Sequence, residues 1–357
     1  MEEYMRLAIE LAKNGTGFTN PNPLVGAVIV KDGRVIGKGW HERYGDLHAE
    51  RNALKNCTED PKGADMYVTL EPCCHHGKQP PCTDAVITAG IGHVYAGSYD
   101  PNPLVAGKSL GLLRSHGIEV TEGVLKDECD ALNPIFFHYI THKTPYVIMK
   151  CAVSADGRIA AHTGASKWIT SEASRDDAQL LRKRCAAIMV GINTVLADDP
   201  MLNCRCKEPS DPVRVICDSH LRIPLDSKII KTARDIPTII AAAGGADAEK
   251  AERIKAAGAD VIFTGGGRTD ITELMRVLGG RGIDSVLAEG GASLHASLLR
   301  AGLVNETIVY IAPKIIGGDG MPAVGALGVE TPDDAVMLGE PEIKRIGSDV
   351  RLRYIIK

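Results

Sequence analysis

The sequence predicts a two-domain protein of the α/β class. The chain has 357 residues, more than the ~100–200 residues typical of one domain. Strand patterns alternate with helix patterns along both halves, which favours layered α/β domains. Thr144-Pro145 interrupts the pattern between the halves, because a residue before proline is disfavoured in a helix. We therefore expect one domain over residues 1–144 and a second over residues 145–357.

The first domain is expected to alternate helices and strands from its start. Residues 2–14 have helical spacing, and residues 25–40 resemble two strands joined by the Asp32-Gly33 turn, a strong hairpin signal. Further helices are expected over residues 48–56, 83–89 and 108–115, and strands over residues 64–70, 93–98 and 119–123. A helix over residues 126–142 should close the domain.

The second domain repeats this alternation, with helices between most of its strands. Strands are expected over residues 146–154, 186–191, 213–218, 238–243, 260–265, 285–291 and 306–313. No Gly-x-Gly-x-x-Gly motif occurs, so the dinucleotide fingerprint of a Rossmann domain is missing. The glycines at 265–267 fit a turn after a strand. Gly290-Gly291 instead lies between a buried strand and a helix, where backbone N–H groups can receive phosphate.

Composition and charge argue against several classes of function. The net charge is −4 and aromatic residues make up 4%, with a pI near 6.3, whereas nucleic-acid-binding domains are usually basic. The N-terminal segment lacks the basic and apolar regions of a secretion signal. No run approaches the ~18 apolar residues of a membrane span. The 10 cysteines form no small-scaffold disulfide pattern, so we expect reduced thiols, some of them on metal, in a cytoplasmic protein.

Two short motifs indicate a catalytic zinc site. His48-Ala49-Glu50 precedes the stretch EPCCHHGKQPPC at residues 71–82. A histidine, a glutamate two residues later and a later pair of cysteines form the signature of zinc deaminases. One imidazole and two thiolates fill three positions of a tetrahedral zinc and leave the fourth open for water. Glu50 can then carry protons to the ring nitrogen and the departing amine. Because residues i and i+2 do not share a helix face, we expect His48 and Glu50 at a helix N-terminus.

The choice of metal ligands rests on the cysteines. Cys73 and Cys82 each follow a proline, whereas Cys74 adjoins Cys73, and neighbouring residues rarely reach one tetrahedral ion without strain. We therefore predict Cys73 and Cys82, together with His48, as the ligands. The eight residues between these cysteines depart from the usual Pro-Cys-x-x-Cys spacing. Two alternatives stay open: a structural zinc with a histidine of the same stretch as fourth ligand, or no metal.

The motifs resemble those of the bifunctional riboflavin-biosynthesis deaminase/reductase family. In the first half the matching stretches are NPLVGAV (22–28), YGDLHAE (44–50), YVTLEPC (67–73), the expanded loop PCxHxGxxPPC and DPNPLVAG (100–107). In the second half they are KCAVSADGRIA (150–160), SKWITS (166–171), VGINTVLADDPMLNCR (190–205), VLAEGGASLH (286–295) and YIAPKIIGG (310–318). Cys74 departs from the expected serine. The resemblance covers essentially the whole chain.

The resemblance implies a fold and two activities. It implies an N-terminal cytidine-deaminase-like α/β/α domain and a C-terminal dihydrofolate-reductase-like α/β domain. The first domain would use zinc to deaminate 2,5-diamino-6-(5-phosphoribosylamino)pyrimidin-4(3H)-one. The second would reduce the ribosyl group to ribityl with NADPH, giving 5-amino-6-(5-phosphoribitylamino)uracil. The resemblance also implies a homodimer, or a higher homo-oligomer, formed through the reductase domain.

The resemblance implies contact residues as well, with Glu50 as the catalytic residue. Contacts to the deaminase substrate fall on Asn22, His41, His75, Lys78 and Asn102. Contacts to the reductase substrate fall on Lys150, Ser166, Arg182, Leu202, Arg205 and Glu289. Contacts to NADPH fall on Ala152, Trp168, Thr194, Asp198, Gly291, Ala292, Ser293, Leu294, His295, Ala296 and Ser297. The lysine ammonium and the two arginine forks suit phosphate. Lys150 and Asp198 are the candidate proton donors for the reduction.

Other interpretations stay open at this point. A nucleic-acid-editing zinc deaminase with a non-catalytic C-terminal domain is one, although few aromatics and an acidic pI oppose it. A second half that only promotes association is another. The echo between PNPLVG at 21–26 and PNPLVA at 101–106 has two readings. It marks either two similar turns or two loops that present Asn22 and Asn102 to one pocket.

Overall fold

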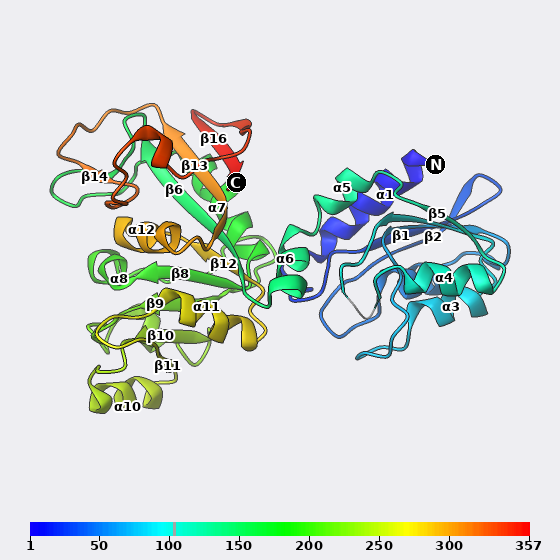
Figure 1. The fold of residues 1–357 in the computed structure, drawn as a ribbon, viewed down its shortest axis with the longest axis horizontal. Coiled ribbons are helices and arrows are strands. Elements are labelled where there is room, and N and C mark those ends of the chain that lie inside the picture. The colour runs from blue at the N-terminus through cyan, green and yellow to red at the C-terminus, as the bar shows by residue number, and fades with distance from the viewer. Residues whose placement is uncertain (103–104) are drawn as a thin grey trace. The chain divides into compact units, whose positions relative to one another are not determined.

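The computed structural model describes residues 1–102 and 105–357, and it divides the chain into two compact units, Met1–Lys143 and Thr144–Lys357 (Figure 1). This division falls one residue before the expected boundary. Pro103 and Leu104, which belong to the DPNPLVAG stretch, lie outside the described residues. Within the described ranges, no helix has both the length and the hydropathy needed to cross a membrane.

The first unit is built on a five-stranded sheet of order β2-β1-β3-β4-β5. Its strands are β1 (Gly26–Lys31), β2 (Arg34–Trp40), β3 (Asp65–Leu70), β4 (His93–Ser98) and β5 (Glu119–Glu122). β1 pairs antiparallel with β2 and β3, whereas β3, β4 and β5 run parallel. Asp32 and Gly33 have φ values of 50° and 74° at the β1–β2 turn, as a tight hairpin turn requires.

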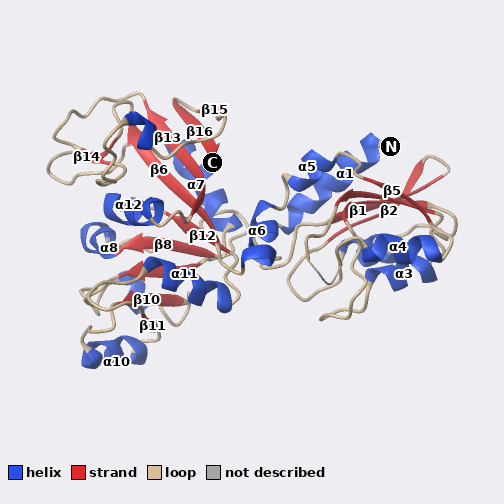
Figure 2. Ribbon diagram, in the orientation of Figure 1, coloured by secondary structure: helices blue, strands red, loops and turns tan. Residues whose placement is uncertain are grey.

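Helices cover both faces of this sheet (Figure 2). They are α1 (Glu2–Ala12), which continues into a short 3₁₀ turn (Lys13–Gly15), α2 (Ala49–Lys55), α3 (Cys82–Thr88), α4 (Lys108–Ser115), α5 (Lys126–Asp130) and α6 (Pro134–His142). Alternate residues of β1 face opposite cores. Ala27 and Ile29 pack with α2, α3 and α4, whereas Val28 and Val30 pack with α1. The predicted α/β/α layering is therefore confirmed.

The expected single helix over residues 126–142 is two helices. Pro134 occupies the start of α6 with Asn133 as its N-cap residue, because a proline inside a helix removes a hydrogen bond and clashes with the preceding turn. The buried Asn133 uses this position: its side chain accepts from the backbone N–H of Leu24 at 2.8 Å and donates to the carbonyl of Leu24 at 2.9 Å. The break thus fixes the segment that carries Asn22.

The second unit is built on a nine-stranded sheet of order β11-β10-β9-β8-β12-β6-β13-β16-β15. Its strands are β6 (Tyr146–Ser154), β8 (Ala187–Gly191), β9 (Val213–Cys217), β10 (Thr238–Ala242), β11 (Asp260–Phe263), β12 (Ser285–Ala288), β13 (Val304–Ala312), β15 (Glu342–Ile346) and β16 (Asp349–Ile355). The seven expected strands are all present and run parallel to their neighbours from β11 to β13. Two short strands, β7 (Arg158–Ala160) and β14 (Met321–Pro322), pair separately.

Helices also cover both faces of this larger sheet. They are α7 (Glu172–Arg184), α8 (Ile192–Asp198), α9 (Lys228–Lys231), α10 (Ala248–Ala256), α11 (Ile271–Gly280) and α12 (Ala292–Arg300). α11 and α12 pack into one apolar core, and α8, α9 and α10 pack into the other. Parallel strands buried on both faces are typical of α/β folds.

The hairpin of β15 and β16 is absent from the expected set of strands. Its strands pair antiparallel, and β16 adds antiparallel to β13. The hairpin turns at Gly347, where φ is +59°, and a Gly-Ser pair between strands is itself a hairpin signal. Charged residues interrupt the alternation of apolar and polar residues that would identify these strands. For example, Arg351 pairs with Glu342 of the opposite strand at 3.0 Å. Such paired charges stand where half-buried strands usually carry apolar residues.

Candidate active sites

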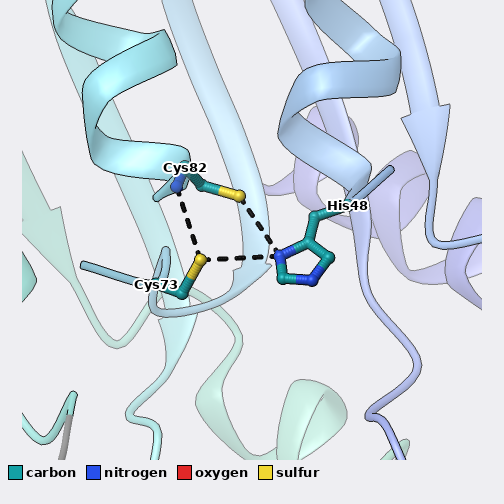
Figure 3. A group of neighbouring side chains, drawn as sticks. All are labelled: His48, Cys73 and Cys82. Atoms are coloured by element: carbon teal, nitrogen blue, oxygen red, sulfur yellow. Dashed lines mark hydrogen bonds between the residues drawn. The ribbon is translucent and has the colours of Figure 1, made fainter. Parts of the chain in front are cut away.

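Three side chains of the first unit converge where two helices begin. His48 is the N-cap residue of α2, Cys82 is the first residue of α3, and Cys73 follows the end of β3. The Nδ1 atom of His48 lies 3.5 Å from Sγ of Cys73 and 3.3 Å from Sγ of Cys82 (Figure 3). Among the described residues, this is the one group of three or more potential metal ligands whose donor atoms all lie within 4.8 Å of one another.

The arrangement fits a tetrahedral zinc ion. Zinc bonds of ~2.3 Å to sulfur and ~2.0–2.1 Å to nitrogen imply sulfur–nitrogen separations of about 3.6 Å. The observed 3.5 and 3.3 Å lie close to this value. Thiolates and imidazole are also the ligands that zinc prefers. Within the described part of the chain, Cys74 and the two histidines that follow it do not belong to the group.

Hydrogen bonding prepares the cysteines for a metal. A hydrogen bond from the Cys82 thiol holds the pKa of Cys73 well below its usual range, and His48 helps, although burial opposes it. The backbone N–H of Cys82 also donates to Sγ of Cys73 at 3.4 Å. The hydrogen bond to Cys73 raises the pKa of Cys82, as does burial. One thiolate is therefore favoured even without a cation, and a cation favours both.

Glu50 lies in the first turn of α2 beside these ligands without joining them. Its side chain is only 3% exposed. Burial raises the pKa of its carboxyl group, and the nearby Cys73 thiolate adds to the shift. A carboxyl group that keeps a proton closer to neutral pH can both accept and return one, as general acid–base catalysis requires.

His48, Cys73 and Glu50 line a pocket of about 280 Å³. All five residues expected to contact the deaminase substrate line it, together with His48, Glu50 and Cys73: Asn22, His41, His75, Lys78 and Asn102. Asn22 and Asn102 come from the two PNPLV stretches. Their presence in one pocket favours the reading in which each loop presents an asparagine to the same ligand.

His41 is held in its neutral form and fixes Asn22. Burial lowers the pKa of its imidazole, although the Leu47 carbonyl opposes the shift. The Nδ1 atom of His41 lies 3.1 Å from that carbonyl oxygen, and its Nε2 atom lies 3.1 Å from Nδ2 of Asn22. In the tautomer that satisfies both contacts, Nδ1–H donates to Leu47 and Nε2 accepts from Asn22. The amide of Asn22 is thereby oriented at the pocket wall.

Two pocket carboxylates were missed by the sequence analysis. Glu71 accepts from Oγ of Ser109 at 2.6 Å and from the backbone N–H of Gly107 at 3.0 Å. Burial raises the pKa of Asp100 to about 6, although the N–H of Asn102 opposes the shift. Both carboxylates line the pocket. Each stands in a motif, EPC or DPNP, directly before or close to a predicted cysteine ligand or asparagine contact, and this proximity is the sequence signal for both.

In the second unit, three of the residues expected to contact the reductase substrate interact with a fourth, Glu289. Arg182 donates from Nε and Nη2 to its two carboxylate oxygens at 2.9 and 3.0 Å. Lys150 lies 3.9 Å away, and Arg205 adds to the positive potential. Burial opposes ionisation of Glu289, but these cations outweigh it and lower its pKa to about 2. The guanidinium of Arg182 also donates to the Asn203 carbonyl at 2.9 Å, so its fork is already engaged within the protein.

The expected NADPH residues fall into exposed and buried groups. Trp168 is 61% exposed and lies under the guanidinium of Arg175 at 4.4 Å, and Asp198 pairs with Lys167 at 3.6 Å. Thr194 lies close enough to the Gly290-Gly291 turn that side chains there would contact it. Three residues of α12 are buried instead: Leu294, His295 and Ala296. Leu202, an expected contact to the reductase substrate, is buried as well.

His295 supports this turn from inside. Its Nδ1 lies 2.9 Å from the Ala323 carbonyl, and the N–H of Gly290 donates to its Nε2 at 3.3 Å. Gly290 and Gly291 have φ values of 129° and 87°, which side chains rarely adopt. Because the N–H of Gly290 already donates to His295, the groups left to bind a phosphate here are the backbone N–H groups at the start of α12.

Comparison with known proteins finds relatives of both units. The chain matches the cytidine and deoxycytidylate deaminase zinc-binding region over residues 1–98 and the RibD C-terminal domain over residues 145–352. It is 52% identical to riboflavin biosynthesis protein RibD of Actinobacillus pleuropneumoniae, over 99% of this chain and 95% of that protein. It is also similar to the solved structure of Acinetobacter baumannii RibD, with a TM-score of 0.91, 37% identity, and coverage of 100% and 98% of the two chains.

A second similar solved structure is that of an enzyme with both a deaminase and a reductase activity. It is a diaminohydroxyphosphoribosylaminopyrimidine deaminase/5-amino-6-(5-phosphoribosylamino)uracil reductase from Thermotoga maritima. The TM-score is 0.87 at 37% identity, and 100% of this chain and 98% of that one are covered. These matches extend over both units. The chain therefore belongs to the RibD family of bifunctional riboflavin-biosynthesis enzymes, with a zinc-dependent deaminase domain followed by an NADPH-dependent reductase domain.

Proposed function

We propose that residues 1–144 deaminate the diaminopyrimidinone ribosyl 5′-phosphate and that residues 145–357 then reduce its ribosyl group to ribityl. The observation that carries the deaminase assignment is the convergence of two thiols and one imidazole beside a buried carboxyl group at the end of a pocket. Family membership carries the reductase assignment. Incubation with the substrate, with and without NADPH, followed by mass spectrometry tests both steps.

For the deamination, His48, Cys73 and Cys82 are proposed to hold zinc, with the other pocket residues binding the substrate. When bound, zinc supplies a water activated for attack near neutral pH. Glu50 would take the first proton of the attacking water and give it to the ring nitrogen. It would then take the second proton from the hydroxyl formed at the carbon and give it to the amine, which departs as ammonia and leaves a carbonyl. Asn22 and Asn102 orient the pyrimidine, and Lys78 contacts the phosphate.

For the reduction, Arg182 and Arg205 are proposed to have different roles, because the guanidinium of Arg182 already donates to Glu289 and to the Asn203 carbonyl. Arg182 is proposed to hold the Glu289 carboxylate in place, and the exposed Arg205 is proposed to contact the phosphate. Glu289 then accepts hydrogen bonds from the substrate, and Lys150 is the proposed proton donor beside it. Trp168, Thr194 and the start of α12 are proposed to hold NADPH, which would supply the hydride when bound.

The enzyme is proposed to act in the cytoplasm as a homo-oligomer formed through the reductase domain. Metal binding by Cys73 and Cys82 needs reduced thiols, which a reducing compartment maintains. Large apolar side chains are exposed in the C-terminal part of the chain: Ile315, Val336, Met337, Leu338, Ile343, Val350 and Ile355. Exposed apolar side chains mark interfaces where they gather on one surface, and the proposal places these at the contact between copies of the chain. Cell fractionation tests the location.

The nucleic-acid-editing interpretation is not favoured. Relatives that match over nearly the whole chain are riboflavin-biosynthesis proteins. An editing enzyme of this layout would also need a basic groove with stacking aromatics, whereas this chain has a net charge of −4 and 4% aromatics.

Replacing either proposed cysteine ligand should remove the metal. Cys73→Ser and Cys82→Ser are each expected to lose zinc and deaminase activity, because a hydroxyl is a poor zinc ligand. Cys74→Ser is the matched control and should keep both. Metal analysis of the purified variants and ammonia release measure the two properties. Zinc loss in the Cys74 variant would overturn the ligand assignment.

Glu50→Gln should separate metal binding from chemistry. The amide has the same shape but cannot carry protons, so deamination is expected to fall by ~10²–10⁴-fold. Zinc content should stay at the wild-type level, and NADPH-dependent reduction of pre-deaminated substrate should be unchanged. Deamination at close to the wild-type rate would remove Glu50 from the mechanism.

Glu289→Gln should weaken the second unit in a pH-dependent way. The pKa of Glu289 is lowered to about 2 in the folded protein, below the ~4.3 of an unfolded glutamate. Its carboxylate therefore stabilises the fold above pH ~4.3. This stabilisation should disappear as the pH falls towards 2. Urea unfolding should show wild type more stable than the variant at pH 7, with the gap closing in acid.

Reductase activity should also fall in this variant, because the proposed substrate acceptor is lost. The exposed Glu330 supplies a control, since Glu330→Gln should change stability by less than ~0.5 kcal/mol at either pH. A pH-independent gap for the Glu289 variant would contradict the electrostatic explanation.

Ile343→Lys should dissociate the proposed oligomer. Ile343 lies on the edge strand β15 and is 66% exposed, so a charge there disturbs an interface without entering a core. Phe263→Lys is the control, because Phe263 is 40% exposed on β11 at the other edge of the sheet. Sedimentation velocity should show a lower mass for the first variant only. A monomeric wild-type enzyme would refute the oligomer.

A further inference from the structure

Two loops meet at the mouth of the deaminase pocket. One precedes α2 and carries Tyr44 and Gly45, and the other is the expanded Cys-rich loop with Lys78 and Gln79. The side chain of Gln79 donates from Nε2 to the Gly45 carbonyl at 2.8 Å. The Nζ atom of Lys78 lies 3.9 Å from the centroid of the Tyr44 ring. All four residues line the pocket, although the proposed reaction uses only Lys78.

The Tyr44 ring stands on a fixed backbone. The N–H of Tyr44 donates to the Phe18 carbonyl at 2.9 Å, and His41 contacts the Leu47 carbonyl at the other end of the loop. Gly45 has a φ of +91°, which allows the sharp turn directly after the ring. The ring itself remains 44% exposed at the mouth of the pocket. Its position is therefore set by the backbone and not by side-chain burial.

The ring holds the ammonium group without neutralising it. Among the described residues, no carboxylate forms an ion pair with Lys78, and its recorded partner is the face of Tyr44. A carboxylate at this place would compete with an anionic ligand, whereas an aromatic face attracts the cation and leaves its charge available. A flexible lysine side chain otherwise loses considerable conformational entropy when it is ordered by a ligand.

We infer that Tyr44 is a positioning residue for the substrate phosphate. Its ring keeps the Lys78 ammonium at the pocket mouth, where the 5′-phosphate of the substrate arrives, and the Gln79 contact holds the two loops together. An ammonium group carries three N–H donors, so one side of it can bind the phosphate while its contact with the Tyr44 ring persists. The inference rests on the proposed contact between Lys78 and phosphate.

The experiment measures KM and kcat for deamination of two substrates, the 5′-phosphate and its dephosphorylated nucleoside. Tyr44→Leu removes the ring, and Tyr44→Phe keeps the ring without the hydroxyl. For the phosphorylated substrate, Tyr44→Leu should raise KM about two- to fivefold at unchanged kcat. Tyr44→Phe should retain the wild-type KM. For the nucleoside, neither variant should change KM, because no phosphate reaches Lys78. Zinc content should be equal throughout.

Lys78→Met separates this inference from the proposal on which it rests. If Lys78 contacts phosphate, Lys78→Met raises KM for the phosphorylated substrate, and Tyr44→Leu adds nothing in that background. An unchanged KM in Lys78→Met refutes the phosphate contact itself. A raised KM in Lys78→Met with no effect of Tyr44→Leu refutes the role of Tyr44 alone. Equal effects of Tyr44→Leu on both substrates, or additive effects of the two changes, would also refute it.

Discussion

The first unit depends on one constraint: two thiols and an imidazole must meet at one point, with a carboxyl group beside them but outside this candidate metal site. Placing His48 at the N-cap of α2 and Cys82 at the start of α3 meets it, because helix N-termini can aim side chains along the helix axis instead of across a face. Cys73 arrives from the end of β3. Glu50 stays in the first turn of α2, buried and with a raised pKa, beside the ligands and not among them.

The pocket walls are built outward from this point by hydrogen bonds between segments that are distant in sequence. The side chain of Asn133, the N-cap residue of α6, hydrogen-bonds to the backbone N–H and carbonyl of Leu24, next to the turn that carries Asn22. The Glu71 carboxylate accepts hydrogen bonds from Gly107 and Ser109, which follow the loop that carries Asn102. Both anchors are buried, and a buried polar group that loses its partner costs more than the bond contributes. The pocket shape is therefore tied to the stability of the unit.

The second unit also buries a carboxyl group, but there neighbouring cations keep it ionised. Glu289 is buried, yet it stays ionised because Arg182 grips both of its oxygens and Lys150 lies nearby. Removing one partner of such a pair leaves an uncompensated charge, which is costly in an interior. In the first unit, burial raises the pKa of Glu50, and the nearby Cys73 thiolate adds to the shift. The same residue type is thus the proposed proton carrier in one unit and an ion-paired carboxylate in the other.

The sequence by itself determined the α/β class, the near position of the break between units, most strands, and the zinc motif, because these follow from local patterns and from ligand chemistry with few solutions. Tertiary structure alone decided what depends on distant partners. From the sequence, the guanidinium of Arg182 suits a phosphate group, but in the folded protein it donates to the carboxylate of Glu289. Arg214 gave no signal at all, yet it is fully buried and donates to the carbonyls of Met201, Ile229 and Ile236. The partner of a charged or polar side chain is set by residues far along the chain, and no local pattern encodes that choice.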